Sequence, residues 1–314
     1  MSLVWQIDSK GGFLTSPELS TEVRSQSQTM QVFRNFVTLA DSEANFGIHR
    51  GDTMQFVKVS DTQDGRVVGE TELVPTGSLN FFRDQVVAQE FTLGIDYSWR
   101  LDTLAKLDVH HTLVQALINS MTRTLDRACA AIYRAMDLVY TPIGSRANPQ
   151  FVLGTAGVPL AVATRPFSLY DHMNIIDLMG GTYHMPLYDT NNYVSVGTPK
   201  YCRSFFEDSK FERIVTPNNA DKFYSAEIGE IYQGRITKET NALDNDLGND
   251  LGEAVYFGKD AVMEMVVHPE EIQAKLGADY GRDRGLRWVW FGNWVQTWSF
   301  PNEGEARGIR VYSL

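Results

Sequence analysis

A long amphipathic pattern between Asp108 and Tyr140 constrains the fold of this chain more than any other segment. Apolar residues recur there at steps of three and four, the spacing that places side chains on one face of a helix. Asp108 suits the start of such a helix, and Pro142 with Gly144 is typical of its end. About 30 helical residues extend roughly 45 Å, so the pattern predicts a spine helix. The residues that we expect to face the body are Leu117, Leu125 and Ile132.

The periodicity changes from helical to alternating in the residues before this helix. Residues 53–59 alternate apolar and polar side chains, 61–65 form a turn cluster, and 66–74 alternate again up to Pro75. We predict a long hairpin here, followed by one more strand over 86–96. Few of its side chains are apolar enough for a core, so we expect the hairpin to project and to pair with another molecule. An ordinary hairpin folded on its own domain is the alternative.

The segments on either side of these elements differ in composition. Residues 1–30 are rich in Ser, Thr, Gln and Gly, which predicts an extended arm without a core of its own. Residues 30–40 suit a short amphipathic helix or a strand. The Pro- and Gly-rich residues 142–166 indicate a domain boundary after the spine helix. The hundred residues beyond alternate between short helices and strands, which predicts a compact α/β or α+β unit.

The individual elements of the second half are predicted as follows. We expect helices over 168–179 and 199–206, strands over 193–196 and 235–240, a helix end over 227–232, and a strand with a helical or extended segment within 254–267. A helical turn is expected over 270–275. Aromatic-rich strands are expected over 287–300 and 309–314, on either side of a turn at 301–304.

The charge and the cysteines bear on partners and on cellular location. A formal net charge of −11 argues against a protein that coats nucleic acid by neutralising phosphates, although an acidic inner wall suits a container for packed DNA. Cys129 and Cys202 match no metal spacing, so we expect buried, reduced thiols. Residues 1–10 carry no targeting signal, and no stretch is apolar enough to span a bilayer. We therefore expect a cytoplasmic protein with no membrane partner.

No arrangement of residues in the sequence indicates catalysis. Gly-rich nucleotide loops, the G-x-S-x-G and H-E-x-x-H motifs and C-x-x-C are absent, and the six histidines are dispersed. The sequence predicts no enzyme and no cofactor. Residues 244–253 alternate Asp and Asn with Gly as a calcium loop does, but their offsets do not match an EF-hand. A solvated acidic loop is favoured, and a calcium-binding enzyme is the alternative of a different class. The candidate metal ligands are Asp244, Asp246, Asp250 and Glu253.

The closing segment adds a resemblance. Residues 279–290 read DYGRDRGLRWVW and lead into alternating apolar and polar residues. With the order of arm, hairpin, strand, spine helix, α/β insertion and returning strands, this segment resembles the major capsid proteins of tailed bacteriophages, the fold first described in the Hong Kong phage. The resemblance covers nearly the whole chain. It implies an α+β capsid fold with an N-terminal arm (1–30), a connecting segment (31–49), an extended loop (50–75), a peripheral domain (76–144), an axial domain (145–265) and a return to the peripheral domain (266–314).

The resemblance implies a structural role. It implies self-assembly into hexamers and pentamers of an icosahedral head that encloses double-stranded DNA without reading its sequence. Implied partners are other copies of the chain and, as candidates, scaffolding, portal and decoration proteins, in a virion assembled in the host cytoplasm. An encapsulin-like bacterial compartment shell shares the fold and is the alternative. The covalent crosslink of the Hong Kong phage is not carried over, because Lys58 is the only hairpin lysine and nothing places an Asn opposite it.

Five residues are candidates for contacts between subunits. They are Phe56, Lys58 and Arg66 on the hairpin, and Arg282 and Arg284 in the closing segment. The two closing arginines exceed what the neighbouring carboxylates need, so we expect them to reach an adjacent subunit. An internal strut is the alternative, and exposed pairs of that kind contribute only about 0 to 1 kcal/mol.

Overall fold

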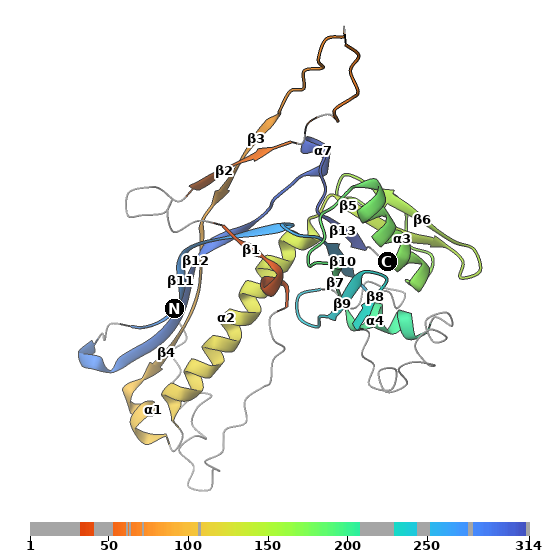
Figure 1. Ribbon diagram of the computed structural model, residues 1–314. Helices are drawn as coiled ribbons and strands as arrows, with labels where there is room; N and C mark the ends of the chain where they lie inside the picture. Colours follow the sequence, from red (N-terminus) through yellow and green to blue (C-terminus); the bar gives the residue numbers. More distant parts are fainter. Residues whose placement is uncertain are drawn as a thin grey trace.

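Two sheets and a projecting hairpin make up the architecture (Figure 1). The computed structural model describes residues 32–40, 53–60, 62, 64–70, 72–105, 108–207, 229–243, 252–275 and 279–311. A four-stranded sheet runs beside the long helix, a seven-stranded sheet forms a second body, and the hairpin extends away from both. The arm predicted for residues 1–30 lies outside the described residues.

The four-stranded sheet has the strand order β1-β11-β12-β4. Its strands are β1 (Thr38–Leu39), β4 (Gln89–Ser98), β11 (Val262–Ala274) and β12 (Asp283–Gln296). β12 pairs antiparallel with β11 and with β4, and β1 pairs parallel with β11. The helical turn predicted for 270–275 is wrong, because residues 271–274 extend β11 along its partner β12. The register slips on both sides of His268, next to Pro269, which has no N–H to donate to the ladder.

The spine helix α2 (Val109–Arg134) packs on this sheet. Its start is confirmed, since the Asp108 carboxylate accepts the backbone N–H of His111 at 2.9 Å. Leu117 and Leu125 are fully buried, whereas Ile132 is half-buried at the edge of the core. The helix ends earlier than predicted, because the β-branched and aromatic residues from Leu138 onward pair as a strand instead. Its 26 residues span roughly 39 Å.

The seven-stranded sheet has the order β6-β5-β13-β10-β7-β9-β8. Its strands are β5 (Leu138–Gly144), β6 (Pro149–Gly154), β7 (Tyr193–Gly197), β8 (Gly229–Ile231), β9 (Gly234–Lys238), β10 (Ala254–Phe257) and β13 (Gly308–Val311). Helices α3 (Leu169–Asp177) and α4 (Pro199–Phe206), with the π-helical turn η3 (Leu178–Thr182), contribute to its core. The helices predicted over 168–179 and 199–206 and the strands over 193–196 and 235–240 are confirmed.

The first half of the passage 142–166, where a domain boundary is expected, contains the end of β5 and all of β6, which pair antiparallel. The helix end predicted within 227–232 is wrong, because these residues include the strand β8, which pairs with β9. Membership of the sheets also crosses the expected boundaries: β5 and β13 belong to the seven-stranded sheet, although 76–144 and 266–314 were expected to be peripheral. β11 likewise begins before residue 266.

The hairpin is formed by β2 (Thr53–Val59) and β3 (Phe81–Val87). The strand predicted over 66–74 is wrong, because the partner of β2 comes later in the chain. That pairing brings Val86 beside Met54, and both join Ala88 and Met265 in a small apolar cluster. The strand predicted over 86–96 is therefore divided between β3 and β4.

The remaining short elements connect the larger ones. They are η2 (Phe33–Phe36), α1 (Trp99–Leu104), η4 (Asp279–Gly281) and α7 (Phe300–Glu303). Both η2 and β1 fall in residues 30–40, where a short helix or a strand was expected. Phe33 of η2 is fully buried against α2, whose Asp126 carboxylate accepts the N–H groups of Val32 and Arg34. Within the described residues, no helix is both long and apolar enough to cross a membrane.

Candidate assembly surfaces

The hairpin has one face against the body and one face toward solvent. Residues alternate between the faces of a strand, so Met54, Phe56 and Lys58 point inward while Val57 and Val59 point outward. Val59 lies opposite Phe81 in the ladder, and all three outward residues are exposed. The outward face of the hairpin therefore presents an apolar strip, defined here as Val57, Val59 and Phe81.

Beyond the strands, the described part of residues 60–80 forms a long loop that extends away from the body (Figure 1). Within it, Ser60 N–H donates to the Asn80 carbonyl at 2.9 Å, and Arg66 pairs with Glu72 at 2.9 Å. The loop nevertheless carries large apolar side chains, with Val67 98% and Leu73 89% exposed. Exposed apolar side chains on a projecting loop are available for burial against another molecule.

The base of the hairpin is held by Lys58. Its ammonium donates to Asp84 Oδ2 at 2.5 Å, to the carbonyl of Thr297 at 2.7 Å and to Glu303 Oε2 at 2.7 Å. Only 4% of the side chain is exposed, so Lys58 is enclosed within its own chain, and its expected contact with a neighbour stays a prediction. A buried ammonium needs such anionic and carbonyl partners, and the neighbouring hairpin strand and α7 supply them.

The other two hairpin candidates differ in exposure. Phe56 is half-buried on the inward face, with its ring 5.7 Å from the Lys58 ammonium. Arg66 is exposed on the loop and pairs with Glu72 of the same loop. Of the three hairpin candidates, Arg66 therefore stands where a neighbouring subunit would reach it, and its role there stays a prediction.

Arg282 and Arg284 of the closing segment have different surroundings. Arg284 donates to Asp102 of α1 at 2.8 Å, while Lys275 neutralises Asp283 at 2.6 Å and Asp96 at 3.2 Å. Within the chain Arg284 ties β12 to α1 as an internal strut would, and its expected contact with a neighbouring subunit stays a prediction. The Arg282 side chain is exposed, and its backbone carbonyl accepts the N–H of Trp99 at 2.9 Å. Its contact with a neighbouring subunit stays a prediction.

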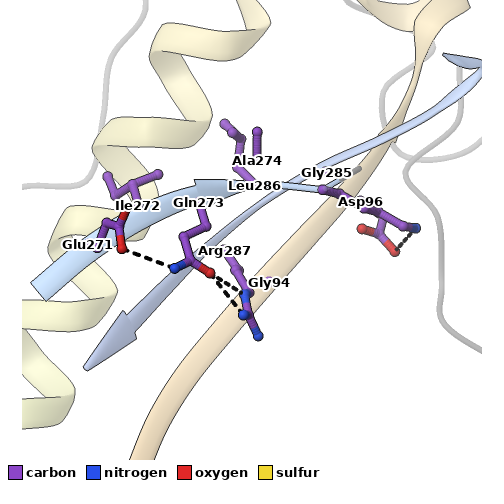
Figure 2. A pocket seen from close by; sticks show the side chains of 10 residues that line it. Gly94, Asp96, Glu271, Ile272, Gln273, Ala274, Gly285, Leu286 and Arg287 are labelled. Atoms are coloured by element: carbon purple, nitrogen blue, oxygen red, sulfur yellow. Dashed lines mark hydrogen bonds and ion pairs between the residues drawn. The ribbon is translucent and has the colours of Figure 1, made fainter. Parts of the chain in front are cut away.

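A groove of about 790 Å³ lies on the four-stranded sheet near this segment (Figure 2). Gln273 of β11 accepts from Arg287 of β12 at 2.8 and 3.1 Å and donates to Glu271 at 3.0 Å. Ile272 and Leu286 are the strand neighbours of Gln273 and Arg287, and they pack in the core with α2. The groove is therefore lined by both polar and apolar residues, and Gln273 and Arg287 bridge adjacent strands along it.

Glu253, the last of the candidate metal ligands, is paired with two cations inside the chain. Glu253 is fully buried and accepts from Arg134 at 3.0 Å and from Arg310 at 2.9 Å, so its carboxylate is committed to two internal cations. Asp244, Asp246 and Asp250 lie outside the described residues. Across the part of the chain that the structure describes, no three His, Cys, Asp or Glu side chains gather as metal ligands.

A buried polar network went unnoticed in the sequence. His172 bridges the Tyr256 hydroxyl and the Ile231 carbonyl, each at 2.8 Å, and burial lowers the pKa of its imidazole to about 4. Nearby, Arg165 pairs with Asp171 at 2.5 Å. These groups satisfy one another inside the seven-stranded body, so they are structural. Their only signal in the sequence is the amphipathic helix on which Asp171 and His172 lie.

Solved structures with high similarity to this chain are phage capsids. The capsid asymmetric unit of cyanophage Pam1 has a TM-score of 0.70 at 11% identity, covering 95% of this chain and 96% of that chain. The capsid of Helicobacter pylori bacteriophage KHP30 has 0.67 at 11%, covering 98% and 97%. The capsid of Ralstonia phage GP4 has 0.64 at 14%, covering 100% and 98%. No family model and no curated protein matches the sequence. The α+β capsid fold expected from the sequence is confirmed.

Proposed function

We propose that this chain is a major capsid protein that assembles with copies of itself into the icosahedral head of a tailed phage. The observation that carries the proposal is the hairpin with its loop, which exposes an apolar strip and large apolar loop residues on a chain with the capsid fold. A monomer gains nothing from exposing these side chains. A second copy placed over them would bury them, and permanent interfaces of this type usually exceed about 2,000 Å².

The parts of the fold take distinct roles in this proposal. The hairpin and loop, residues 53–87, serve as the extended loop that lies on the next subunit. The spine helix with the four-stranded sheet serves as the peripheral domain, and the seven-stranded body serves as the axial domain around which hexamers and pentamers close. The arm at 1–30 is assigned to a contact with a neighbour.

The proposed shell encloses double-stranded DNA without reading its sequence. The net charge of −11 supports this, because an acidic wall does not hold the packed genome by phosphate neutralisation. Scaffolding, portal and decoration proteins are the proposed accessory partners, the virion is the proposed location, and the host cytoplasm is the proposed site of assembly. The role is structural, with no catalytic step assigned to any residue.

The test removes the loop and keeps the strands. Replacing residues 61–79 by Asn-Gly closes β2 and β3 through a two-residue turn, which the Ser60–Asn80 hydrogen bond already prepares. We expect this variant to remain folded, because the loop adds nothing to either core, and to form no stable shells in electron micrographs. The matched control is Glu72→Gln in the full-length loop, which should assemble. Normal particles from the shortened variant would refute the assignment.

The content of the particles decides between two shells of the same fold. Particles purified with genomic DNA support the phage head. Particles that carry a packaged enzyme instead of DNA, identified by mass spectrometry, support the encapsulin-like compartment.

A further inference from the structure

The hairpin meets the body through a narrow base, so its direction depends on few contacts. At one end of the base, the apolar cluster of Met54, Val86, Ala88 and Met265 joins the hairpin to the four-stranded sheet, and Asn293 donates to the Val87 carbonyl at 2.8 Å. At the other end stands Lys58. The two attachments differ in kind, because an apolar cluster tolerates sliding and rotation, whereas hydrogen bonds to an ammonium have defined directions.

Lys58 connects three segments of the chain. Its three donors reach Asp84 on β3, the carbonyl of Thr297 after β12, and Glu303 on α7. Glu303 also accepts the backbone N–H of Ser299 at 3.0 Å, so it closes α7 and holds the hairpin at once. The Trp298 ring lies 5.2 Å from the ammonium, a distance at which a cation is attracted to the face of an indole.

The group formed by Lys58, Asp84 and Glu303 contains more negative than positive charge. One ammonium lies between two carboxylates, of which Glu303 is 6% exposed and Asp84 is 41% exposed. Without the ammonium, two anions would remain close together, one of them away from water. Their repulsion and the desolvation of Glu303 would both favour a hairpin that has swung away from α7.

We infer that Lys58 is a positioning residue that latches the hairpin to α7 and thereby sets where the loop of one subunit reaches the next. The hairpin turns about the apolar cluster, and the contacts of Lys58 hold it in one orientation. The assembly half of the inference rests on the proposed function, whereas the latch itself is a property of the single subunit.

Three substitutions form a graded series. Lys58→Met removes the cation and leaves both carboxylates, so it opens the hairpin most. Glu303→Gln keeps the pair with Asp84 and opens it less. Asp84→Asn opens it least, because Asp84 is already partly hydrated. Adding Glu303→Gln to Lys58→Met removes the repulsion as well, and should return part of the original position.

The experiment measures the distance between two spin labels in the unassembled full-length subunit. Val57→Cys on the outward face of the hairpin and Leu160→Cys on the second body are exposed sites, while Cys129 and Cys202 are buried and escape labelling. We expect a single narrow distance for the labelled parent and a longer or broader distribution for Lys58→Met. Arg66→Met, which removes a cation from the loop beyond the base, is the control and should keep the parent distribution.

An unchanged distribution in a cooperatively folded Lys58→Met variant overturns the latch. If that variant fails to fold, Glu303→Gln decides in its place by the same criterion. Electron microscopy of the unlabelled Lys58→Met variant tests the second half, where normal shells from an opened hairpin would overturn the link to assembly. A parent chain that forms no shells at all refutes the proposed function and leaves the distance result standing.

Discussion

The spine helix buries many of its apolar side chains, whereas the hairpin and its loop expose many of theirs. Leu117 and Leu125 are fully buried between α2 and the four-stranded sheet, whereas Val67, Leu73 and Phe81 are exposed on the loop and the hairpin. Burial supplies about 25 cal/mol per Å² of apolar surface, so the helix gains this energy within the subunit, whereas the exposed side chains of the hairpin and loop gain it only against another molecule. Substitutions in the two regions should therefore separate subunit stability from assembly.

The largest effect is expected in the spine helix. Leu125→Ala leaves a cavity at a fully buried position and should lower the free energy of unfolding of the unassembled subunit by about 2 to 5 kcal/mol. Ile118→Ala, at a partly exposed position of the same helix, is the control and should change it by about 0.5 kcal/mol or less. Denaturant titration measures both. Equal effects of the two variants would contradict the assignment of Leu125 to the buried face of the helix.

Acid should destabilise the seven-stranded body through His172. Burial lowers the pKa of His172 from 6.5 to about 4, so the folded state keeps the imidazole neutral while the unfolded chain takes up a proton. Stability is therefore complete above pH 6.5 and falls by about 3 kcal/mol as the pH drops to 4, at ~1.4 kcal/mol per pKa unit.

The His172→Gln variant isolates this contribution. Glutamine can still bridge the Tyr256 hydroxyl and the Ile231 carbonyl, but it does not titrate. Unfolding free energies at pH 7 and pH 4.5 should differ less in the variant than in the parent. The same pH dependence in both proteins would assign the acid sensitivity to other groups.

A smaller effect is expected where β12 begins. Arg284→Ala breaks a partly exposed ion pair with Asp102 and should cost the subunit roughly 0 to 1 kcal/mol. Arg282→Ala should leave the melting temperature nearly unchanged and reduce the yield of shells. Thermal melts combined with particle counts by electron microscopy test this pair. A large loss of melting temperature in Arg282→Ala with normal shells would make Arg282 an internal strut too.

The smallest effect on the subunit is expected on the apolar strip. Val57→Ser and Phe81→Ser change exposed positions, so each should alter the unfolding free energy by about 0.5 kcal/mol or less. Both should nevertheless weaken assembly, because serine has little apolar surface to bury against a neighbour. The matched control is Gln85→Ser, on β3. Shells that form equally well from all three variants would show that the strip is not an interface.

The elements that the sequence predicted correctly are those with a local cause. Asp108 caps α2, and the helix over 199–206 begins at a proline that suits its first turn. The fold class followed from the family resemblance, which rests on the order of the elements and on the closing segment 279–290. The pairing of the hairpin did not, because residues 66–74 alternate as a strand does and only the apolar cluster around Met54 selects residues 81–87 instead.

The surroundings of the candidate residues also depend on contacts between residues distant in sequence, which the sequence pattern does not reveal. Lys58 appears in the sequence as an isolated cation on a polar hairpin, and two of its three partners are residues 297 and 303, more than 200 positions away. Glu253 likewise appears as the end of an acidic loop, although Arg134 and Arg310 neutralise it. Arg66 and Arg282, which were predicted to contact a neighbouring subunit, are exposed, and that contact stays a prediction.

The antiparallel run of β11, β12 and β4 has a mechanical consequence. Its inter-strand hydrogen bonds lie perpendicular to the strands, and 14 residues of β12 extend roughly 48 Å at ~3.4 Å per residue. A pull along the strands therefore loads many ladder bonds together in shear, and none can open before its neighbours share the force. The adjacent α2 resists buckling along the same axis. In the shell proposed above, tension would thus be carried through each subunit along the length of β12.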